Sequence, residues 1–252
     1  MKRVRYKKES DSEVLEEIDS ILEKRPSYGH KRVTAMINKK RRQEGLSKFN
    51  RKRIFRVMEM NSLLLKKETV LREHEKTGTI ITLHSNTRWC SDGLEIQCFN
   101  GEKVYVAFSL DCHDREAISY VASKMPLLAT DIQNLMIQSV DARFKDGKTS
   151  RDIQWLSDRG SIYRALDTKQ LGRRLGLVSC FTAAYSPQSN GMSEAFVGTL
   201  KRDYVYTNDC FDADTVLKML PGWFKDYNEQ APHSGLGMMS PLEYKNEIKQ
   251  GA

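Results

Sequence analysis

A succession of strand and helix patterns from Thr87 onward most constrains what this chain can fold into. Along the run from Val104 to Asp111, every second side chain is apolar, as on one face of a strand: Val104, Val106, Phe108 and Leu110. An Asn-Gly turn at Asn100 joins this run to an earlier strand-like run, Trp89 to Phe99, and predicts a hairpin. A third strand is expected at Ala117 to Ser123, so the sheet starts antiparallel.

After Pro126 helix and strand patterns alternate, which predicts a mixed sheet with helices on its faces. Further strands are expected at Ile153 to Ser157 and at Leu177 to Phe181. Helices are expected over these ranges: Thr130 to Phe144, Arg164 to Leu175, from about Gln188, and Asp212 to Tyr227. Near the end, Ser240, Pro241 and Glu243 have the residue types and spacing of a capping box. The predicted fold class is therefore α/β.

The first third of the chain has a different pattern, that of short helices. One is expected from Ser10 to Arg25, with Ser10 and Glu13 as a capping box, and a second from His30 to Arg42. A third begins after Asn50, a good cap, and places Lys52, Arg53 and Arg56 together on one face. This arrangement is typical of a helix-turn-helix that binds DNA. We divide the chain into a basic helical domain (1–65), a linker (66–86) and a catalytic core (87–252).

Positive charge is concentrated in that first third. Residues 1–76 hold 22 Lys and Arg against 12 Asp and Glu, whereas the remainder holds 19 against 21. A basic module joined to a nearly neutral body indicates a polyanionic partner. Solubility alone would also account for part of such a charge.

Other classes of protein are disfavoured by the composition. No run of the sequence approaches the roughly 18 apolar residues of a membrane span, and the N-terminus lacks the apolar stretch of a signal peptide, so a cytoplasmic location is expected. The five cysteines are scattered without a CxxC pair. We expect them to be reduced and buried rather than joined in disulfides or bound to zinc.

Three carboxylates are candidates for chemistry. Asp92 shares the parity of Leu94 and Ile96 in its strand, so an acid points to the same face as apolar side chains, which is costly without compensation. Asp158 directly follows a strand, where ligands bind in sheets with parallel strands, although a local role in the turn before Gly160 is the commoner fate of such an aspartate. Glu194 lies early on its helix, about 10 Å by helical rise from Lys201.

Carboxylates from two strands and a helix suit two magnesium ions, which take oxygen ligands and promote phosphoryl transfer. A scissile phosphate near Glu194 would leave the adjoining DNA strand within reach of Lys201. The sequence contains no GxGxxG, GxxxxGK[ST] or GxSxG string that would favour another chemistry.

Several segments together resemble the DDE transposases of bacterial insertion sequences, specifically their OrfB part, whose core is similar to that of retroviral integrases. The segments are WCSDGLEI, LDCHDREAISY, WLSDRGSIYRA, SPQSNGMSEAFVGTLKRDY and YNEQAPHSGLGMMSPLEY. The segment SYGHKRVTAMI, with the basic helix after it, resembles the helix-turn-helix-like region ahead of that core. The resemblance extends from about Glu13 to Ile248.

The resemblance implies an RNase H-like core and a Mg²⁺-dependent enzyme, with two ions and with Mn²⁺ as a substitute. By the matching positions, the catalytic and metal-binding triad is Asp92, Asp158 and Glu194. Asp111 and Asp114 match a second-strand motif and not the triad. The residues expected to contact DNA are Lys201, Arg202, Asn190 and Gly191, together with the basic helix residues Lys52, Arg53 and Arg56.

The implied activity is nicking of the ends of the element, followed by transfer of the 3′-OH to a target phosphodiester. The implied partners are DNA, further copies of the chain in a synaptic complex, and an upstream OrfA-type product or fusion. A membrane is not among them, and association with the nucleoid is expected. The alternative is a DNA-binding regulator or transposon relic that keeps the fold without turnover, and a plain nuclease of the RNase H type is a weaker one.

Overall fold

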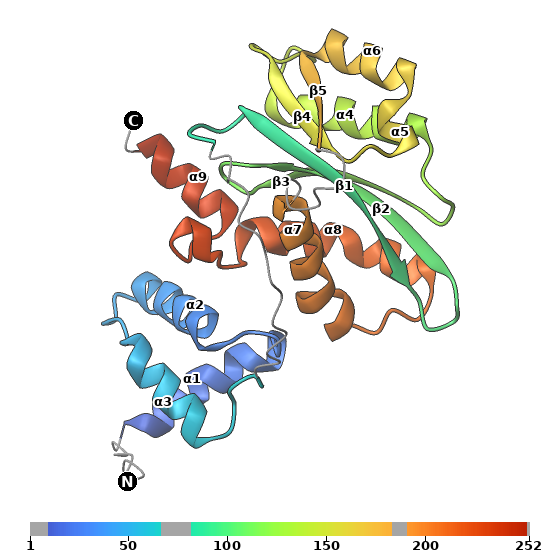
Figure 1. The fold of residues 1–252 in the computed structure, drawn as a ribbon. Coiled ribbons are helices and arrows are strands. Elements are labelled where there is room, and N and C mark those ends of the chain that lie inside the picture. Colours follow the sequence, from blue (N-terminus) through green and yellow to red (C-terminus); the bar gives the residue numbers. More distant parts are fainter. Residues whose placement is uncertain (1–9, 67–81, 183–190, 251–252) are drawn as a thin grey trace. The chain divides into compact units, whose positions relative to one another are not determined.

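A computed structural model describes residues 10–66, 82–182 and 191–250 (Figure 1). The chain forms two compact units, one of residues 1–73 with 232–239 and the other of residues 74–231 with 240–252. Of the predicted linker 66–86, the structure describes Lys66 and 82–86. The predicted division of the chain at 65 and 86 stays a prediction.

The first unit contains three helices: α1 (Asp11–Lys24), α2 (His30–Gln43) and α3 (Arg51–Met60). Their inner faces form one apolar core that includes Val14, Ile18, Val33, Ile37, Ile54, Val57 and Met58. The predicted cap of the third helix is confirmed, because the Asn50 side chain accepts a hydrogen bond of 2.8 Å from the backbone N–H of Lys52. The predicted capping box at Ser10 is wrong: its hydroxyl accepts a hydrogen bond of 2.6 Å from Arg53 Nη2 instead.

The second unit is built on a five-stranded sheet in the order β3-β2-β1-β4-β5. Its strands are β1 (Arg88–Gln97), β2 (Lys103–Asp111), β3 (Ala117–Ser123), β4 (Ile153–Ser157) and β5 (Leu177–Phe181). The first three strands pair antiparallel, whereas β4 pairs parallel with both β1 and β5. The predicted mixed sheet with an antiparallel start is confirmed.

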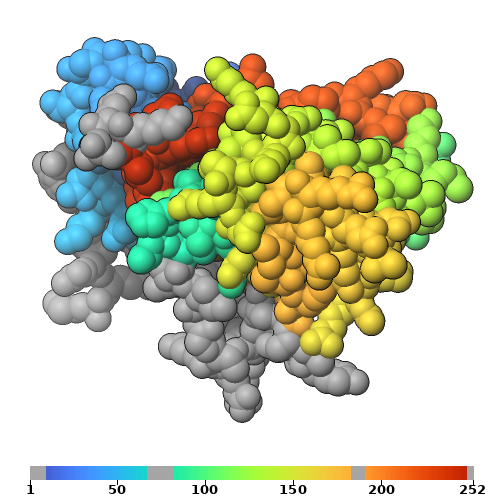
Figure 2. Space-filling view, turned by 90° about the horizontal axis from the view of Figure 1, so that it is seen from above, coloured from blue at the N-terminus to red at the C-terminus, as the bar shows by residue number. Residues whose placement is uncertain are grey.

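Helices cover both faces of this sheet (Figure 1). They are α4 (Ala129–Arg143), α5 (Ser161–Arg164), α6 (Leu166–Leu175), α7 (Gly191–Asp203) and α8 (Ala213–Glu229), and a further helix, α9 (Pro241–Gln250), packs against α8. Figure 2 shows the side chains of α4, in yellow-green, beside those of α5 and α6, in yellow to orange. The helix predicted from Arg164 begins at Leu166 because the backbone of Ala165 is extended.

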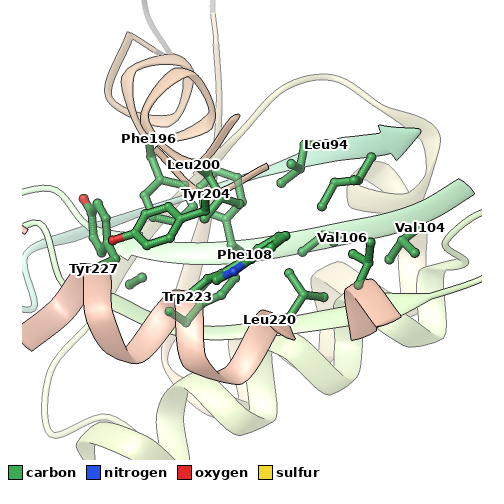
Figure 3. Close-up of a cluster of buried hydrophobic side chains, with 14 of the residues drawn as sticks. Leu94, Val104, Val106, Phe108, Phe196, Leu200, Tyr204, Leu220, Trp223 and Tyr227 are labelled. Atoms are coloured by element: carbon green, nitrogen blue, oxygen red, sulfur yellow. The ribbon is translucent and has the colours of Figure 1, made fainter. Parts of the chain in front are cut away.

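The opposite face of the sheet is covered by α7 and α8 (Figure 3). All four alternating apolar residues of β2 are buried on this face, as predicted: Val104, Val106, Phe108 and Leu110. Phe196 and Leu200 of α7 pack into the same cluster as Trp223 and Tyr227 of α8. The apolar core therefore fixes α7 against the two central strands.

The predictions for the last helix are confirmed, and those for the cysteines are confirmed in part. The capping box at the start of α9 is confirmed, since Glu243 Oε2 accepts the N–H of Ser240 at 2.9 Å and Ser240 Oγ accepts the N–H of Glu243 at 3.4 Å. All five cysteines are free, but only Cys90, Cys98 and Cys210 are buried. The prediction of burial is wrong for the two that remain partly exposed, Cys112 and Cys180. Within the described ranges, no helix has the length and apolar character needed to cross a membrane.

Candidate active site

Two neighbouring parallel strands bring Asp92 and Asp158 to the same level of the sheet. The parallel pairing of β1 with β4 ends with Cys90 opposite Leu156. Asp92 and Asp158 each lie two residues further along their own strands, and Asp158 comes directly after the end of β4. The register therefore sets the two aspartates side by side across the sheet, as the sequence predicted for a site at the carboxyl end of a parallel strand.

The face to which Asp92 belongs is also as predicted. Leu94 and Ile96, which share its parity, are buried in the cluster beneath α7 and α8. Asp92 itself is partly buried, and its Oδ1 accepts a hydrogen bond of 2.8 Å from the N–H of Gly93. A carboxylate thus lies at the border of an apolar face, next to the helix that carries Glu194.

Glu194 lies in the first turn of α7 and is exposed, while Ser193, Phe196 and Leu200 are buried. The Phe196 ring packs 4.4 Å, between centroids, from the ring of Phe108. Phe108 is the cross-strand partner of Asp92 in the pairing of β1 with β2. Phe196 also packs against Phe224 and Tyr227 of α8, so a cluster of aromatic rings holds the start of α7 close to Asp92.

The electrostatics of Asp92 show that the three carboxylates influence one another. Burial raises the pKa of Asp92 above its ordinary value, and the negative charges of Asp158 and Glu194 raise it further. The hydrogen bond from Gly93 acts in the opposite direction but does not cancel this increase. The charges of both Asp158 and Glu194 act on Asp92, which agrees with the expectation that the three residues lie near one another as one acidic site.

Asp158 also has the local role that its sequence context suggested. Its Oδ1 accepts a hydrogen bond of 3.0 Å from the N–H of Gly160, which closes the turn after β4. A Cβ on residue 160 would lie only 3.0 Å from the same Oδ1, so glycine keeps the turn tight around the carboxylate. The turn fixes where Asp158 stands without removing it from the acidic site.

As arranged, the acidic site is not a preformed metal cage. In residues 10–66, 82–182 and 191–250, no group of three or more His, Cys, Asp or Glu side chains is close enough to hold one ion. Burial, together with the charges of Asp158 and Glu194, disfavours the ionised form of Asp92, as its raised pKa indicates. Their oxygens are nevertheless the donors that hard divalent cations prefer, so the residues present fit such an ion.

Replacing Asp92 by Asn is expected to stabilise the protein in metal-free buffer. Since the folded state raises the pKa of Asp92, its ionised form costs folding free energy at every pH above the unfolded-state pKa of about 3.9. We expect the melting temperature at pH 7 to rise by a few degrees, since about 1 kcal/mol shifts it by roughly 2–4 °C in proteins of 150–250 residues.

This gain in melting temperature should shrink as the pH falls to and below the unfolded-state pKa of about 3.9, because the wild-type carboxyl then becomes protonated in both states. Thermal unfolding followed by circular dichroism at several pH values measures it. The matched control is Glu95→Gln, which alters an exposed carboxylate of the same strand that pairs with Lys103 at 2.7 Å. A lower melting temperature for Asp92→Asn than for the wild type at pH 7 would contradict the expectation that burial and the neighbouring charges disfavour the ionised form of Asp92.

Comparison with known proteins identifies the family. Two models, both described as integrase core domain, match residues 83–187 and 176–241. The Escherichia coli transposase InsD for insertion element IS2A/D/F/H/I/K is 41% identical over 93% of this chain and 78% of its own length. The chain belongs to the transposases of bacterial insertion elements. Its function is accordingly in DNA transposition.

The fold of the transposase is also found among solved structures. A chain of the simian T-cell lymphotropic virus intasome, solved in complex with PP2A regulatory subunit B56 gamma, aligns with 90% of this chain and 73% of its own, with a TM-score of 0.55 and 14% identity. The strand order and the helices on both faces confirm the predicted RNase H-like core. At so low an identity the likeness concerns the fold alone.

The residues of α7 that were predicted to contact DNA differ in their exposure and in their ion pairing. Gly191 is exposed at the first position of this helix, and Asn190 lies outside the described residues. Lys201 is partly exposed, two turns from Glu194. Arg202 is paired with the neighbouring Asp203, at 2.7 Å between Nε and Oδ1 and 2.8 Å between Nη2 and Oδ2. Lys201 is thus the better placed of the two cations to meet a phosphate.

In the helical unit of the transposase, two of the three predicted DNA contacts have an internal partner. Arg56 Nη2 lies 2.8 Å from Asp11 Oδ2, and Arg53 Nε lies 3.2 Å from Asp11 Oδ1. Lys52, by contrast, is exposed. Asp11 opens α1, far from α3 in the sequence, so helical spacing within α3 gave no sign of this neutralisation.

The two aspartates outside the triad share a buried cationic partner that was not predicted from the sequence. Asp111 and Asp114 are fully buried, and Arg143 Nη2 approaches Asp114 Oδ1 at 3.3 Å and Asp111 Oδ2 at 3.9 Å. The same guanidinium pairs with Glu116 at 3.0 Å. The signal available in the sequence was the position of Arg143 on the inward face of its helix, in register with Met136 and Val140.

Proposed function

We propose that this transposase nicks DNA at the ends of its element and joins the freed 3′-OH to a target phosphodiester at the site formed by Asp92, Asp158 and Glu194. The observation that supports the proposal most is the parallel register of β1 and β4, which sets Asp92 beside Asp158. Burial and the charges of Asp158 and Glu194 also raise the pKa of Asp92, and a perturbed carboxyl group of this kind is a mark of a functional site.

The three carboxylates would hold divalent cations, Mg²⁺ or Mn²⁺ in its place, and we propose two of them. Such ions polarise a phosphoryl oxygen and lower the pKa of water. The chain contributes negative charge from three elements: two strands fixed by their parallel register and a helix fixed by its aromatic contact. Asp92 must be deprotonated to act as a ligand, so its raised pKa makes metal affinity increase with pH.

The chemistry consists of two displacements at phosphorus. In the first, water attacks a phosphodiester at the end of the element, the bond to the 3′ oxygen breaks, and a 3′-OH and a 5′-phosphate remain. In the second, that 3′-OH attacks a target phosphodiester, one P–O bond forms and one breaks, and a 3′-OH is released from the target. Neither step needs a nucleophilic side chain, which agrees with a site made of carboxylates alone.

DNA would lie along α7 and on the helical unit. Lys201 is about 10 Å by helical rise from Glu194, so it would meet the strand that adjoins the scissile phosphate. In the helical unit, the exposed cations near the start of α3 and on α2 include Lys31, Arg51 and Lys52. Contacts of this kind bind phosphates irrespective of sequence and weaken with salt.

The partners that complete the reaction are part of the same proposal. Further copies of the chain would bring two ends of the element together in a synaptic complex. An upstream OrfA-type product or fusion would help to recognise the ends. The enzyme would act in the bacterial cytoplasm, in association with the nucleoid.

A strand-transfer assay tests the proposal. The purified chain is incubated with supercoiled plasmid and a labelled duplex bearing a terminal sequence of the element, with Mg²⁺, with Mn²⁺ or with EDTA, and with or without the upstream product. Metal-dependent transfer of label to the plasmid is the expected result. Nicking without joining in every mixture would indicate a nuclease, and DNA binding without any turnover would indicate a regulator. Either outcome would overturn the proposal.

A further inference from the structure

Tyr163 places a hydroxyl deep in the core behind the acidic site. The residue lies on α5, is 5% exposed, and belongs to the apolar cluster beneath α4 that also contains Trp89 and Trp155. Its hydroxyl is 3.1 Å from Ser91 Oγ, and Ser91 is fully buried. Two hydroxyl groups in apolar surroundings thus satisfy each other.

The two hydroxyl groups belong to the segments that carry the two aspartates. Ser91 directly precedes Asp92 on β1, and its side chain points to the opposite face of the sheet because residues alternate along a strand. Tyr163 follows Asp158 by one short turn, and its backbone N–H donates to the carbonyl of Gly160 at 3.1 Å. The Tyr163–Ser91 bond therefore connects the turn that holds Asp158 to the backbone beside Asp92.

The electrostatics of Tyr163 agree with this position. Burial raises the pKa of its hydroxyl, and the charges of Asp92 and Asp158 raise it further, whereas the bond to Ser91 lowers it. The phenol accordingly lies close enough to both carboxylates to be affected by them. It remains behind the sheet, where substrate does not reach it.

Stability alone does not account for this pair. Exchanging a buried, mutually satisfied pair of hydroxyl groups for apolar groups of the same shape is close to neutral in folding free energy. What a directional bond adds is a fixed spacing between the two segments that it joins. Here the bond helps to fix the distance between Asp92 and Asp158, because the pairing of β1 with β4 ends at Cys90 and Leu156, before either aspartate is reached.

We propose that Tyr163, through Ser91, is a positioning residue that sets the spacing of Asp92 and Asp158 for divalent metal binding. This inference rests on the proposed function, because it gives the two aspartates the role of metal ligands. The fixed spacing limits how far their mutual repulsion can drive the carboxylates apart before the ion arrives. Residues behind metal ligands commonly affect metal affinity by about 10–100-fold.

The test compares Tyr163→Phe, Ser91→Ala and the double variant by two measurements made without DNA. One is the dissociation constant for Mn²⁺, obtained from the electron paramagnetic resonance signal of the free ion, and the other is the melting temperature in metal-free buffer. Each single variant leaves one buried hydroxyl unsatisfied and should lose about 1–3 kcal/mol of stability, whereas the double variant should regain most of it.

Affinity for Mn²⁺ is expected to fall by about 10-fold or more in all three variants, since each lacks the bond. Recovery of affinity in the double variant, in parallel with its stability, would overturn the inference and leave the pair a structural one. Tyr204→Phe is the matched control, because Tyr204 is also buried and its hydroxyl donates to Asp226 Oδ2 at 2.9 Å. That control should lose stability while its affinity for Mn²⁺ is unchanged.

Glu194→Gln separates failure of the inference from failure of the proposed function. If Glu194→Gln weakens Mn²⁺ binding and Tyr163→Phe does not, the positioning role is wrong and the metal site stands. If Glu194→Gln leaves Mn²⁺ binding unchanged, the proposed metal site is wrong, and the positioning role is wrong with it.

Discussion

Glu194→Gln is expected to abolish strand transfer, by about 10³-fold or more, while affinity for DNA changes little. The substitution removes one negative charge from the acidic site, and the loss of several kcal/mol of transition-state stabilisation corresponds to such a factor. The fold should persist, because Glu194 is exposed and the neighbouring Phe196 and Leu200 hold α7 in place. Transfer of a labelled duplex to plasmid, together with a gel-shift titration, measures both quantities.

The matched control for this variant is Glu95→Gln, which removes an exposed carboxylate of the same unit outside the acidic site. Its strand transfer should remain within about twofold of the wild type. An equal loss of DNA affinity and of turnover in Glu194→Gln would speak against a role in the chemical step. Retained turnover in that variant would remove Glu194 from the site altogether.

Arg143→Met is expected to have the largest effect on stability, a loss of about 3–5 kcal/mol in the free energy of unfolding at pH 7. The guanidinium is 4% exposed and approaches three carboxylates, those of Asp111, Asp114 and Glu116. Asp111 is further bound by the N–H of Asn86 at 2.7 Å, so the cluster also secures the chain where it enters β1. Glu116 keeps its ion pair with Lys245 at 2.6 Å, but removing the guanidinium leaves the buried Asp111 and Asp114 without this cation, which urea unfolding would reveal.

Acidic pH should reduce the stability that Arg143→Met loses relative to the wild type. Burial and the charge of Asp114 already raise the pKa of Asp111, and without Arg143 the pKa would rise further, so the carboxyl becomes neutral on mild acidification. The difference between the variant and the wild type should therefore narrow as the pH falls. Arg173→Met, which alters an exposed arginine of α6, is the control and should change stability by no more than about 0.5 kcal/mol. If Arg143→Met lost no more stability than Arg173→Met, Arg143 would not be needed to stabilise the three carboxylates.

Local sequence patterns were sufficient to predict most of the strands of the sheet. The strands at Ala117–Ser123, Ile153–Ser157 and Leu177–Phe181 were predicted with the bounds that the structure has, because alternation and flanking turns mark them clearly. The start of α6 was misplaced, since nothing in the sequence near Ala165 signals an extended residue between two helices. The capping box at Ser10 failed for another reason: Arg53, distant in sequence, is bound to its hydroxyl.

The candidate site was predictable where one strand or helix carried the signal. The parity of Asp92 and the position of Asp158 after a strand marked both residues as candidates, and the resemblance to DDE transposases assigned them to the triad. Contacts between elements were not predictable in this way. The Phe108–Phe196 contact, the Tyr163–Ser91 bond and the pairing of Asp11 with Arg56 all join segments that only the fold brings together.

The attachment of Glu194 has a consequence for the order in which the enzyme is made. Both aspartates lie in the sheet of residues 88–181, which leaves the ribosome before α7 does. The third carboxylate arrives only when Phe196 has been synthesised and packs against Phe108. If the proposed function is correct, a polypeptide truncated before α7 would keep the basic helices of the first unit but lack Glu194, so it could not cut DNA. Such fragments would bind DNA through those helices without cutting it and would compete with the full enzyme.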